Sequence, residues 1–145
     1  MLSKTAEYAL RAVVAIARVE GEDRPVLARE ISTKGHIPNK YLSKVLRDLV
    51  HAGVLSSTRG IGGGFRLRRK ADKLKLGEIV RPFDDISARG RCPLGHTKCN
   101  DDAPCAIHER WQPVKEAFRV LMDETTVGEL LKNEQTRETG KRGRR

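Results

Sequence analysis

The chain has 145 residues and a formal net charge of +10, and 38% of its residues are hydrophobic but only 4% aromatic. This length fits one domain, or one compact domain with an extension, whose core rests on aliphatic side chains. No apolar run approaches the roughly 20 residues that a membrane-spanning helix needs, and the first residues lack an apolar signal segment, so we expect a cytoplasmic protein.

The positive charge is concentrated in the first half of the chain. Residues 1–70 contain 14 Lys and Arg against 6 Asp and Glu, whereas residues 71–136 are slightly acidic. Residues 137–145 add five basic residues and one acidic residue. A basic half is typical of proteins that bind a polyanion, although a solvated basic surface has the same composition.

Three helices are expected in the first 52 residues. Apolar residues recur every three or four positions from Leu2 to Val19, which predicts an amphipathic helix. A short helix is expected from Val26 to about Thr33, and a third from Pro38, in its first helical position, to about Ala52, with Gly53 ending it. The third helix is expected to bury Leu42, Val45, Leu46 and Leu49. Two helices joined by a tight turn, the second with a basic outer face, indicate a helix-turn-helix.

A β-hairpin is predicted directly after these helices. Residues 54–58 and 65–69 are rich in β-forming residues and flank a turn with four glycines. A hairpin in this place is typical of the wing of a winged helix-turn-helix. The glycines could also suggest a phosphate-binding loop, but no Gly-Lys-Ser/Thr motif and no helix follow them. A short helix from Leu76 to Val80 precedes Pro82.

The first turns of the third helix are the expected DNA-reading surface, since such turns reach base edges in the major groove. Arg59, at the tip of the wing, is expected to enter the minor groove. The candidate DNA-binding residues are Pro38, Asn39, Lys40, Tyr41, Ser43, Lys44, Arg59, Gly60 and Gly62. An ordinary helical pair in a globular core is the alternative interpretation.

All three cysteines lie in a stretch of little periodicity, which is unusually long for a loop unless something orders it. Cys92, Cys99 and Cys105 are followed by His108. Thiolates suit iron–sulfur clusters or zinc, but zinc sites usually take closely spaced pairs of cysteines, which this stretch lacks. His108 could be the fourth ligand or a surface histidine, and the cysteines could also be simple redox thiols.

A long helix is expected after the cysteines, because Ile107, Trp111, Val114, Phe118 and Leu121 follow coiled-coil spacing. A capping box at residues 126–129 predicts a short last helix. We therefore expect a mainly α-helical protein with one small β-hairpin. Its parts are a winged helix-turn-helix DNA-binding domain (1–83), a cysteine-containing cluster-binding loop (84–105), a dimerisation helix with a short last helix (106–132) and a disordered basic tail (133–145).

Three segments resemble the family of winged-helix regulators that includes the iron–sulfur cluster regulator IscR and the nitric-oxide sensor NsrR. They are residues 4–11 (KTAEYALR), residues 58–67 (TRGIGGGFRL) and the cysteine segment from Cys92-Pro93 to Cys105-Ala106-Ile107-His108. The resemblance covers about residues 1–132. It implies a homodimer built by the long helix, a palindromic DNA operator and a two-iron or four-iron cluster held by the three cysteines.

The resemblance also implies candidates for the fourth cluster ligand. They are His108 and the Glu7 of the partner subunit, with His96 a weaker candidate. Six residues separate Cys92 from Cys99, where the best-known members often have five, so cluster type and fourth ligand stay open. The implied function is a repressor or dual regulator that responds to nitric oxide, oxidants or iron–sulfur status.

Two further functions remain as alternatives. The first is a winged-helix regulator that uses its cysteines as redox thiols or as a zinc site without a cluster. The second, of another class, is an iron–sulfur electron-transfer or carrier protein whose basic half binds an acidic partner. An enzyme is not expected, because the sequence contains no evident pairing of a nucleophile with a base.

Overall fold

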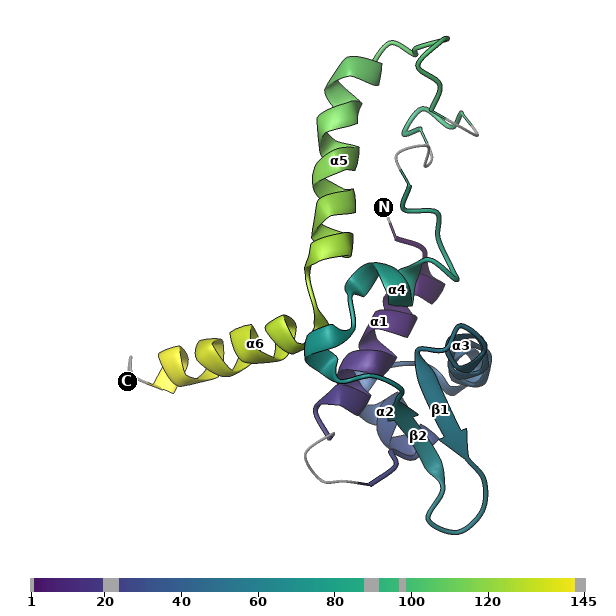
Figure 1. Ribbon diagram of the computed structural model, residues 1–145, viewed down its shortest axis with the longest axis vertical. Helices are drawn as coiled ribbons and strands as arrows, with labels where there is room; N and C mark the ends of the chain where they lie inside the picture. The colour runs from purple at the N-terminus through teal and green to yellow at the C-terminus, as the bar shows by residue number, and fades with distance from the viewer. Residues whose placement is uncertain (1, 20–23, 88–91, 97–98, 143–145) are drawn as a thin grey trace.

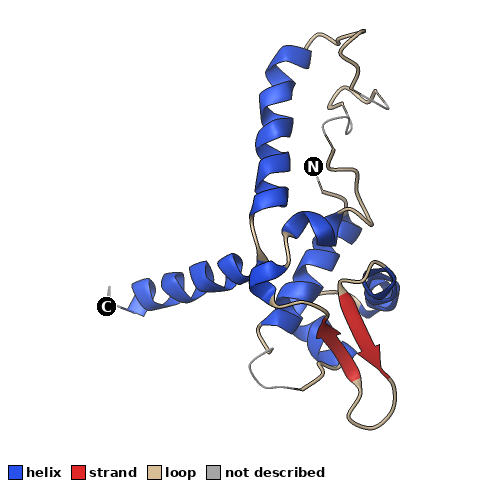
Figure 2. Cartoon of the chain, in the orientation of Figure 1, coloured by secondary structure: helices blue, strands red, loops and turns tan. Residues whose placement is uncertain are grey.

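The computed structural model describes residues 2–19, 24–87, 92–96 and 99–142, with side chains as far as residue 135. The described part is mostly helical with one two-stranded antiparallel sheet, which confirms the predicted fold class (Figures 1 and 2). Its elements are α1 (Lys4–Ala17), α2 (Ala28–Gly35), α3 (Asn39–His51), β1 (Leu55–Thr58), β2 (Gly64–Leu67), the 3-10 helix η2 (Ala71–Lys73), α4 (Leu76–Val80), α5 (His108–Glu124) and α6 (Val127–Arg142). Within these ranges no helix has both the length and the hydropathy of a membrane span.

α1 lies at the centre of the fold because one of its faces is apolar along its whole length. Its start is capped by Ser3, whose hydroxyl accepts a hydrogen bond from the Ala6 N–H at 3.1 Å. Its buried residues are Ala6, Ala9, Ala12, Val13, Ala15, Ile16 and Ala17. The small side chains on this face let α2, α3 and α4 pack closely against it.

The turn between α2 and α3 makes the predicted helix-turn-helix. His36 adopts a left-handed conformation (φ 51°), and the Ser32 hydroxyl donates a hydrogen bond to the Ile37 carbonyl at 2.7 Å. Pro38 has an extended ψ of 133°, so it precedes the helix instead of being its first residue. α3 therefore begins at Asn39, one position later than predicted. Gly53 (φ 74°) follows α3 and ends it as predicted.

The hairpin is the predicted wing, and it is joined to the chain before α2. β1 pairs with β2 from Leu55↔Leu67 to Thr58↔Gly64. The N–H groups of Val26 and Phe65 each donate to the other residue's carbonyl at 2.9 Å. These two bonds tie the wing to the helix-turn-helix, so both parts are held as one unit.

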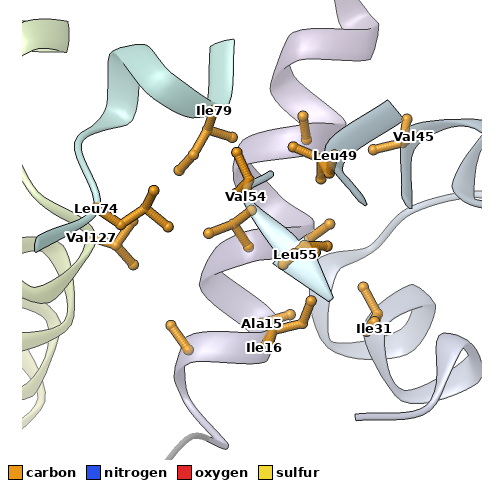
Figure 3. Packing of buried hydrophobic residues seen from close by; sticks show 14 of the residues in the cluster. Ala15, Ile16, Ile31, Val45, Leu49, Val54, Leu55, Leu74, Ile79 and Val127 are labelled. Carbon is orange, nitrogen blue, oxygen red and sulfur yellow. The ribbon is translucent and has the colours of Figure 1, made fainter. Parts of the chain in front are cut away.

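A single hydrophobic core connects this unit to the second half of the chain (Figure 3). Leu49 from α3 and Leu55 from β1 are fully buried in it. Leu74 and Val127 are also fully buried, and the Val127 N–H donates to the Leu74 carbonyl at 2.9 Å. The start of α6 is therefore anchored to the same core as the helix-turn-helix and the hairpin.

α5 extends away from the wing, with the cysteine segment beside it (Figure 1). On the predicted coiled-coil stripe, Trp111 and Phe118 are half-buried, whereas Val114 and Leu121 are 44% and 50% exposed. Part of the stripe thus packs within the chain and part of it faces outward.

α6 is longer than predicted. Its capping box is confirmed, because the Thr126 N–H donates to the Glu129 carboxylate at 2.6 Å and the Glu129 N–H donates to the Thr126 hydroxyl at 3.2 Å. The tail predicted to be disordered from residue 133 is instead helical as far as Arg142. The Glu134 carboxylate accepts hydrogen bonds from both Nε and Nη2 of Arg18, which hold the first turns of α6 near the end of α1.

Candidate DNA-reading surface and metal centre

The outer face of α3 carries exposed polar residues where they were predicted. Asn39, Lys40 and Ser43 are exposed on its first turns. Arg47, one turn further along, is also exposed. The periodicity of α3 already placed Arg47 on this face, although it was not among the predicted contacts.

Tyr41 is fixed by two aromatic contacts. Its ring stacks on that of Tyr8 from α1, with centroids 5.5 Å apart, and the Lys40 ammonium lies 4.8 Å from its centroid. The side chain remains 44% exposed. Tyr41 is therefore preorganised, which reduces the entropy that it loses on binding.

Lys44 is exposed but forms an ion pair. Its ammonium lies 2.7 Å from the Asp48 carboxylate, one turn along α3. Any phosphate that binds Lys44 must compete with this carboxylate.

The wing tip is shaped by its glycines. Gly60 (φ 92°) and Gly62 (φ 77°) adopt left-handed conformations, and the exposed Arg59 precedes them. At Gly63 the restriction is steric, because a Cβ there would lie 2.2 Å from the Thr58 carbonyl oxygen. This close approach, which the run of glycines did not reveal, makes the turn tight enough to present Arg59 at its tip.

The three cysteines and His108 line one cavity of about 340 Å³. The Cys92 and Cys105 sulfurs are 3.6 Å apart, and the Cys99 sulfur is 3.5 Å from His108 Nδ1. The cavity is also lined by His96, Asn100, Ala103 and Pro104. Residues as far as 16 positions apart thus present five metal-binding side chains to one space, those of the three cysteines, His108 and His96.

Both distances fit metal coordination. A tetrahedral metal with bonds of about 2.3 Å to sulfur and about 2.0–2.1 Å to nitrogen places two sulfurs about 3.8 Å apart, and a sulfur and a nitrogen about 3.6 Å apart. The Cys92–Cys105 and Cys99–His108 separations match these edges. In the described part of the chain, no three or more His, Cys, Asp or Glu side chains converge on a single point as a metal site requires. The four side chains therefore form two pairs.

The surroundings of Cys92 favour the thiolate, the form in which cysteine binds metals. A hydrogen bond from the Leu94 backbone lowers the pKa of the Cys92 thiol, and the Cys105 side chain, the His96 backbone and the charge of Lys115 act in the same direction. Cys92 is 5% exposed.

Glu7, the other predicted ligand, lies on α1 and is not among the residues that line the cavity. Its carboxylate accepts a hydrogen bond from the Lys4 ammonium at 2.7 Å, which lowers the pKa of Glu7. Its predicted role concerns the cluster of a partner subunit.

A larger cavity of about 820 Å³ connects the cysteine segment to α3. Cys92 and Pro93 of the cysteine segment and Lys44 and Asp48 of α3 are among the residues that line it. Trp111 of α5 also lines it, and its indole N–H is buried without a hydrogen-bond partner among the described residues. The cysteine segment and α3 therefore border the same cavity.

Comparison with known proteins identifies relatives along almost the whole chain. Residues 2–133 match the family described as Rrf2, iron-dependent transcriptional regulators. The regulator IscR of Klebsiella pneumoniae (strain 342) is 30% identical over 134 residues, which are 92% of this chain and 81% of that protein.

Solved structures of known proteins are also similar to this chain. CymR, the global cysteine regulator of B. subtilis, has a TM-score of 0.73 and 25% identity, and the match covers 90% of this chain and 95% of CymR. IscR of T. potens has a TM-score of 0.73 and 24% identity over 92% of this chain and 88% of that chain, which shows the shared fold. These relatives are regulators of transcription and not enzymes, as the sequence led us to expect.

Proposed function

Because the chain belongs to the Rrf2 family of transcriptional regulators, we propose that it is a DNA-binding repressor or dual regulator controlled by an iron–sulfur cluster. The ligands are Cys92, Cys99, Cys105 and His108, and their convergence on one cavity is the observation that carries the proposal. Such a cluster supplies a redox-active iron centre that oxidants, nitric oxide or iron–sulfur supply could alter. Membership of a regulator family argues against the electron-transfer or carrier alternative.

The pairing of the ligands favours a two-iron cluster over a single zinc ion. One zinc ion needs its four ligands around one point, whereas each iron of a two-iron cluster takes two protein ligands. Cys92 pairs with Cys105, and Cys99 pairs with His108, at distances that each fit one metal atom.

His108 is the proposed fourth ligand, because it lines the cavity and is the partner of Cys99. The ion pair of Glu7 with Lys4 would have to break before Glu7 could reach the cluster of a partner subunit. Among residues of one chain, the geometry thus favours His108.

DNA contact is proposed through α3 and the wing. The first turns of α3 would enter the major groove with Asn39, Lys40, Tyr41, Ser43 and Lys44, and Pro38 would set their approach. Arg59 would reach the minor groove, with Gly60 and Gly62 giving the backbone its shape there.

A homodimer through α5 would explain the exposed part of its apolar stripe. Val114 and Leu121 are half exposed, and the Trp111 indole N–H is buried without a partner in the described residues. A second copy of α5 would cover Val114 and Leu121. A two-fold dimer in turn implies a palindromic operator.

Control of DNA binding would pass through the larger cavity. When all four ligands are held, the segment from Cys92 to His108 has one arrangement, because metal bonds offset the entropy of ordering it. Cys92 and Pro93 line the same cavity as Lys44 and Asp48, so this arrangement would limit how far α3 could move into that space. Release of the ligands would remove that restriction and shift the population of DNA-reading states.

The test of the cluster is anaerobic purification followed by iron, sulfide and zinc assays and a visible spectrum. We expect iron and sulfide in equal amounts, a spectrum altered by His108→Ala and a spectrum unchanged by Glu7→Gln. A colourless protein without iron and sulfide would overturn the proposal, and zinc in its place would support the single-ion alternative.

A second candidate function is a thiol switch without a cluster. The Cys92 and Cys105 sulfurs lie 3.6 Å apart, so a modest movement would allow a disulfide between them. Iron-free protein with an oxidant-dependent Cys92–Cys105 disulfide, identified by mass spectrometry, would favour this function.

A further inference from the structure

The imidazole of His108 has contacts at both of its nitrogens. Nδ1 lies 3.5 Å from the Cys99 sulfur, and Nε2 lies 3.0 Å from Oδ1 of Asp101. The side chain of His108 is only 11% exposed. One ring nitrogen thus faces the cysteine cavity, and the other faces a carboxylate.

The carboxylate contact favours one position for the proton of the neutral ring. An ionised carboxylate can only accept hydrogen bonds, so the contact with Asp101 favours the tautomer in which Nε2 donates and Nδ1 keeps its lone pair. The opposite tautomer would place a lone pair of Nε2 against a negatively charged oxygen. The contact with Asp101 therefore favours Nδ1, next to Cys99, as the nitrogen that binds a metal.

Gln112 fixes this carboxylate from the next turn of α5. Its amide N–H donates to the same Oδ1 of Asp101 at 2.9 Å. The same amide nitrogen lies 3.0 Å from His108 Nε2, to which it could donate only in the tautomer with the ring proton on Nδ1, so Gln112 supports the Nε2–H form through Asp101 alone. His108 and Gln112 are four residues apart and so share one face of the helix. Asp101 is 85% exposed, and two donors on one rigid helix hold it in place.

We propose that Asp101 and Gln112 are positioning residues that orient His108 as an Nδ1 ligand of the metal centre. The inference rests on the proposed function. A carboxylate that accepts from the distal nitrogen of a ligating histidine fixes the ring and increases its basicity, and removal of such a carboxylate typically weakens metal binding about 10- to 100-fold. The negative charge of Asp101 would also disfavour addition of an electron to the nearby iron.

The experiment begins with the cluster-free protein, labelled with ¹⁵N, at a pH where His108 is neutral. Imidazole NMR should show His108 with its proton on Nε2 and slow exchange of that proton. Asp101→Ala should increase its exchange or mix the tautomers. Gln112→Met should have a smaller effect, because it removes both the donor that holds Asp101 and the donor that competes for Nε2. Asp102→Ala is the matched control, because it removes an exposed aspartate one residue away.

The second readout is the reduction potential of the loaded protein. Asp101→Asn should raise the potential and increase cluster loss to a chelator about 10-fold, whereas Asp102→Asn should change either quantity much less. Equal effects of the two substitutions, or a wild-type proton on Nδ1, would overturn the positioning role. An Nε2 proton that depends on Asp101, in a protein that never takes up iron, would support the positioning of His108 and overturn the proposed function.

Discussion

If Lys44 contacts DNA as proposed, Asp48 must compete with the duplex for it, and replacing Asp48 by asparagine tests the proposed orientation of α3. The Lys44 ammonium lies 2.7 Å from the Asp48 carboxylate, and the two side chains are 68% and 28% exposed. Exposed pairs one helical turn apart contribute about 0.3–0.5 kcal/mol. If Lys44 must leave this pair to reach a phosphate, Asp48→Asn should tighten operator binding about twofold per subunit and about fourfold for a dimer.

Lys44→Ala should have the opposite effect. It leaves one phosphate per subunit without its neutralising ammonium, so the slope of log affinity against log salt should become shallower by about 0.9 per subunit bound. Glu134→Gln is the matched control for Asp48→Asn. It also removes one negative charge and breaks an ion pair, the one between Glu134 on α6 and Arg18 after α1.

Fluorescence anisotropy with a labelled operator duplex, repeated over a series of salt concentrations, measures both effects. Thermal unfolding of each variant checks that the fold is retained. The orientation of α3 would be refuted if Asp48→Asn bound DNA no more tightly than Glu134→Gln, or if Lys44→Ala kept the wild-type salt slope.

Further predictions concern stability, the wing and pH. Leu49→Ala should lower the free energy of unfolding by about 2–5 kcal/mol, because Leu49 is fully buried between α3 and the rest of the core; urea unfolding giving less than about 1 kcal/mol would contradict this packing. Gly63→Ala should weaken operator binding more than Gly62→Ala, because a Cβ at Gly63 would lie 2.2 Å from a carbonyl oxygen, whereas at Gly62 nothing lies within 4 Å and the cost is limited to the left-handed φ of 77°; anisotropy showing equally weakened binding would argue against the tight turn. A hydrogen bond from Arg24 lowers the pKa of Glu30 from 4.5 to about 2, so the stability that Glu30 contributes is complete above the unfolded value and is lost as pH falls from about 4.5 towards 2. Glu30→Gln should therefore remove part of the acid dependence of unfolding, and urea curves with the wild-type dependence in this range would refute the contact.

The helix-turn-helix and the wing could be predicted because their determinants are local. The 3.6-residue periodicity of α3, the glycine after it and the β-forming residues on each side of the glycine-rich turn each operate within a few residues. The capping box at Thr126 was equally visible. The length of α6 was missed because its polar sequence has no apolar periodicity, and the contact of Glu134 with Arg18 joins residues 116 positions apart.

The candidate metal centre was predicted in part. Cysteine spacing and the resemblance to a family indicated the three thiols and His108, which the structure brings to one cavity. The pairing of Cys92 with Cys105 and the contact of Asp101 with His108 depend on the path of the loop. No periodicity encodes that path, so these contacts could not be read from the sequence.

The central proposal is that the metal centre controls operator binding, and one titration tests it most directly. Anaerobically purified protein, assayed for iron and sulfide, is titrated with operator DNA before and after its cluster is removed by a chelator. We predict two irons and two sulfides per chain and an operator affinity that changes about 5- to 150-fold when they are removed. Iron-containing protein with the same affinity in both states, or protein with no iron at all, would contradict the proposal.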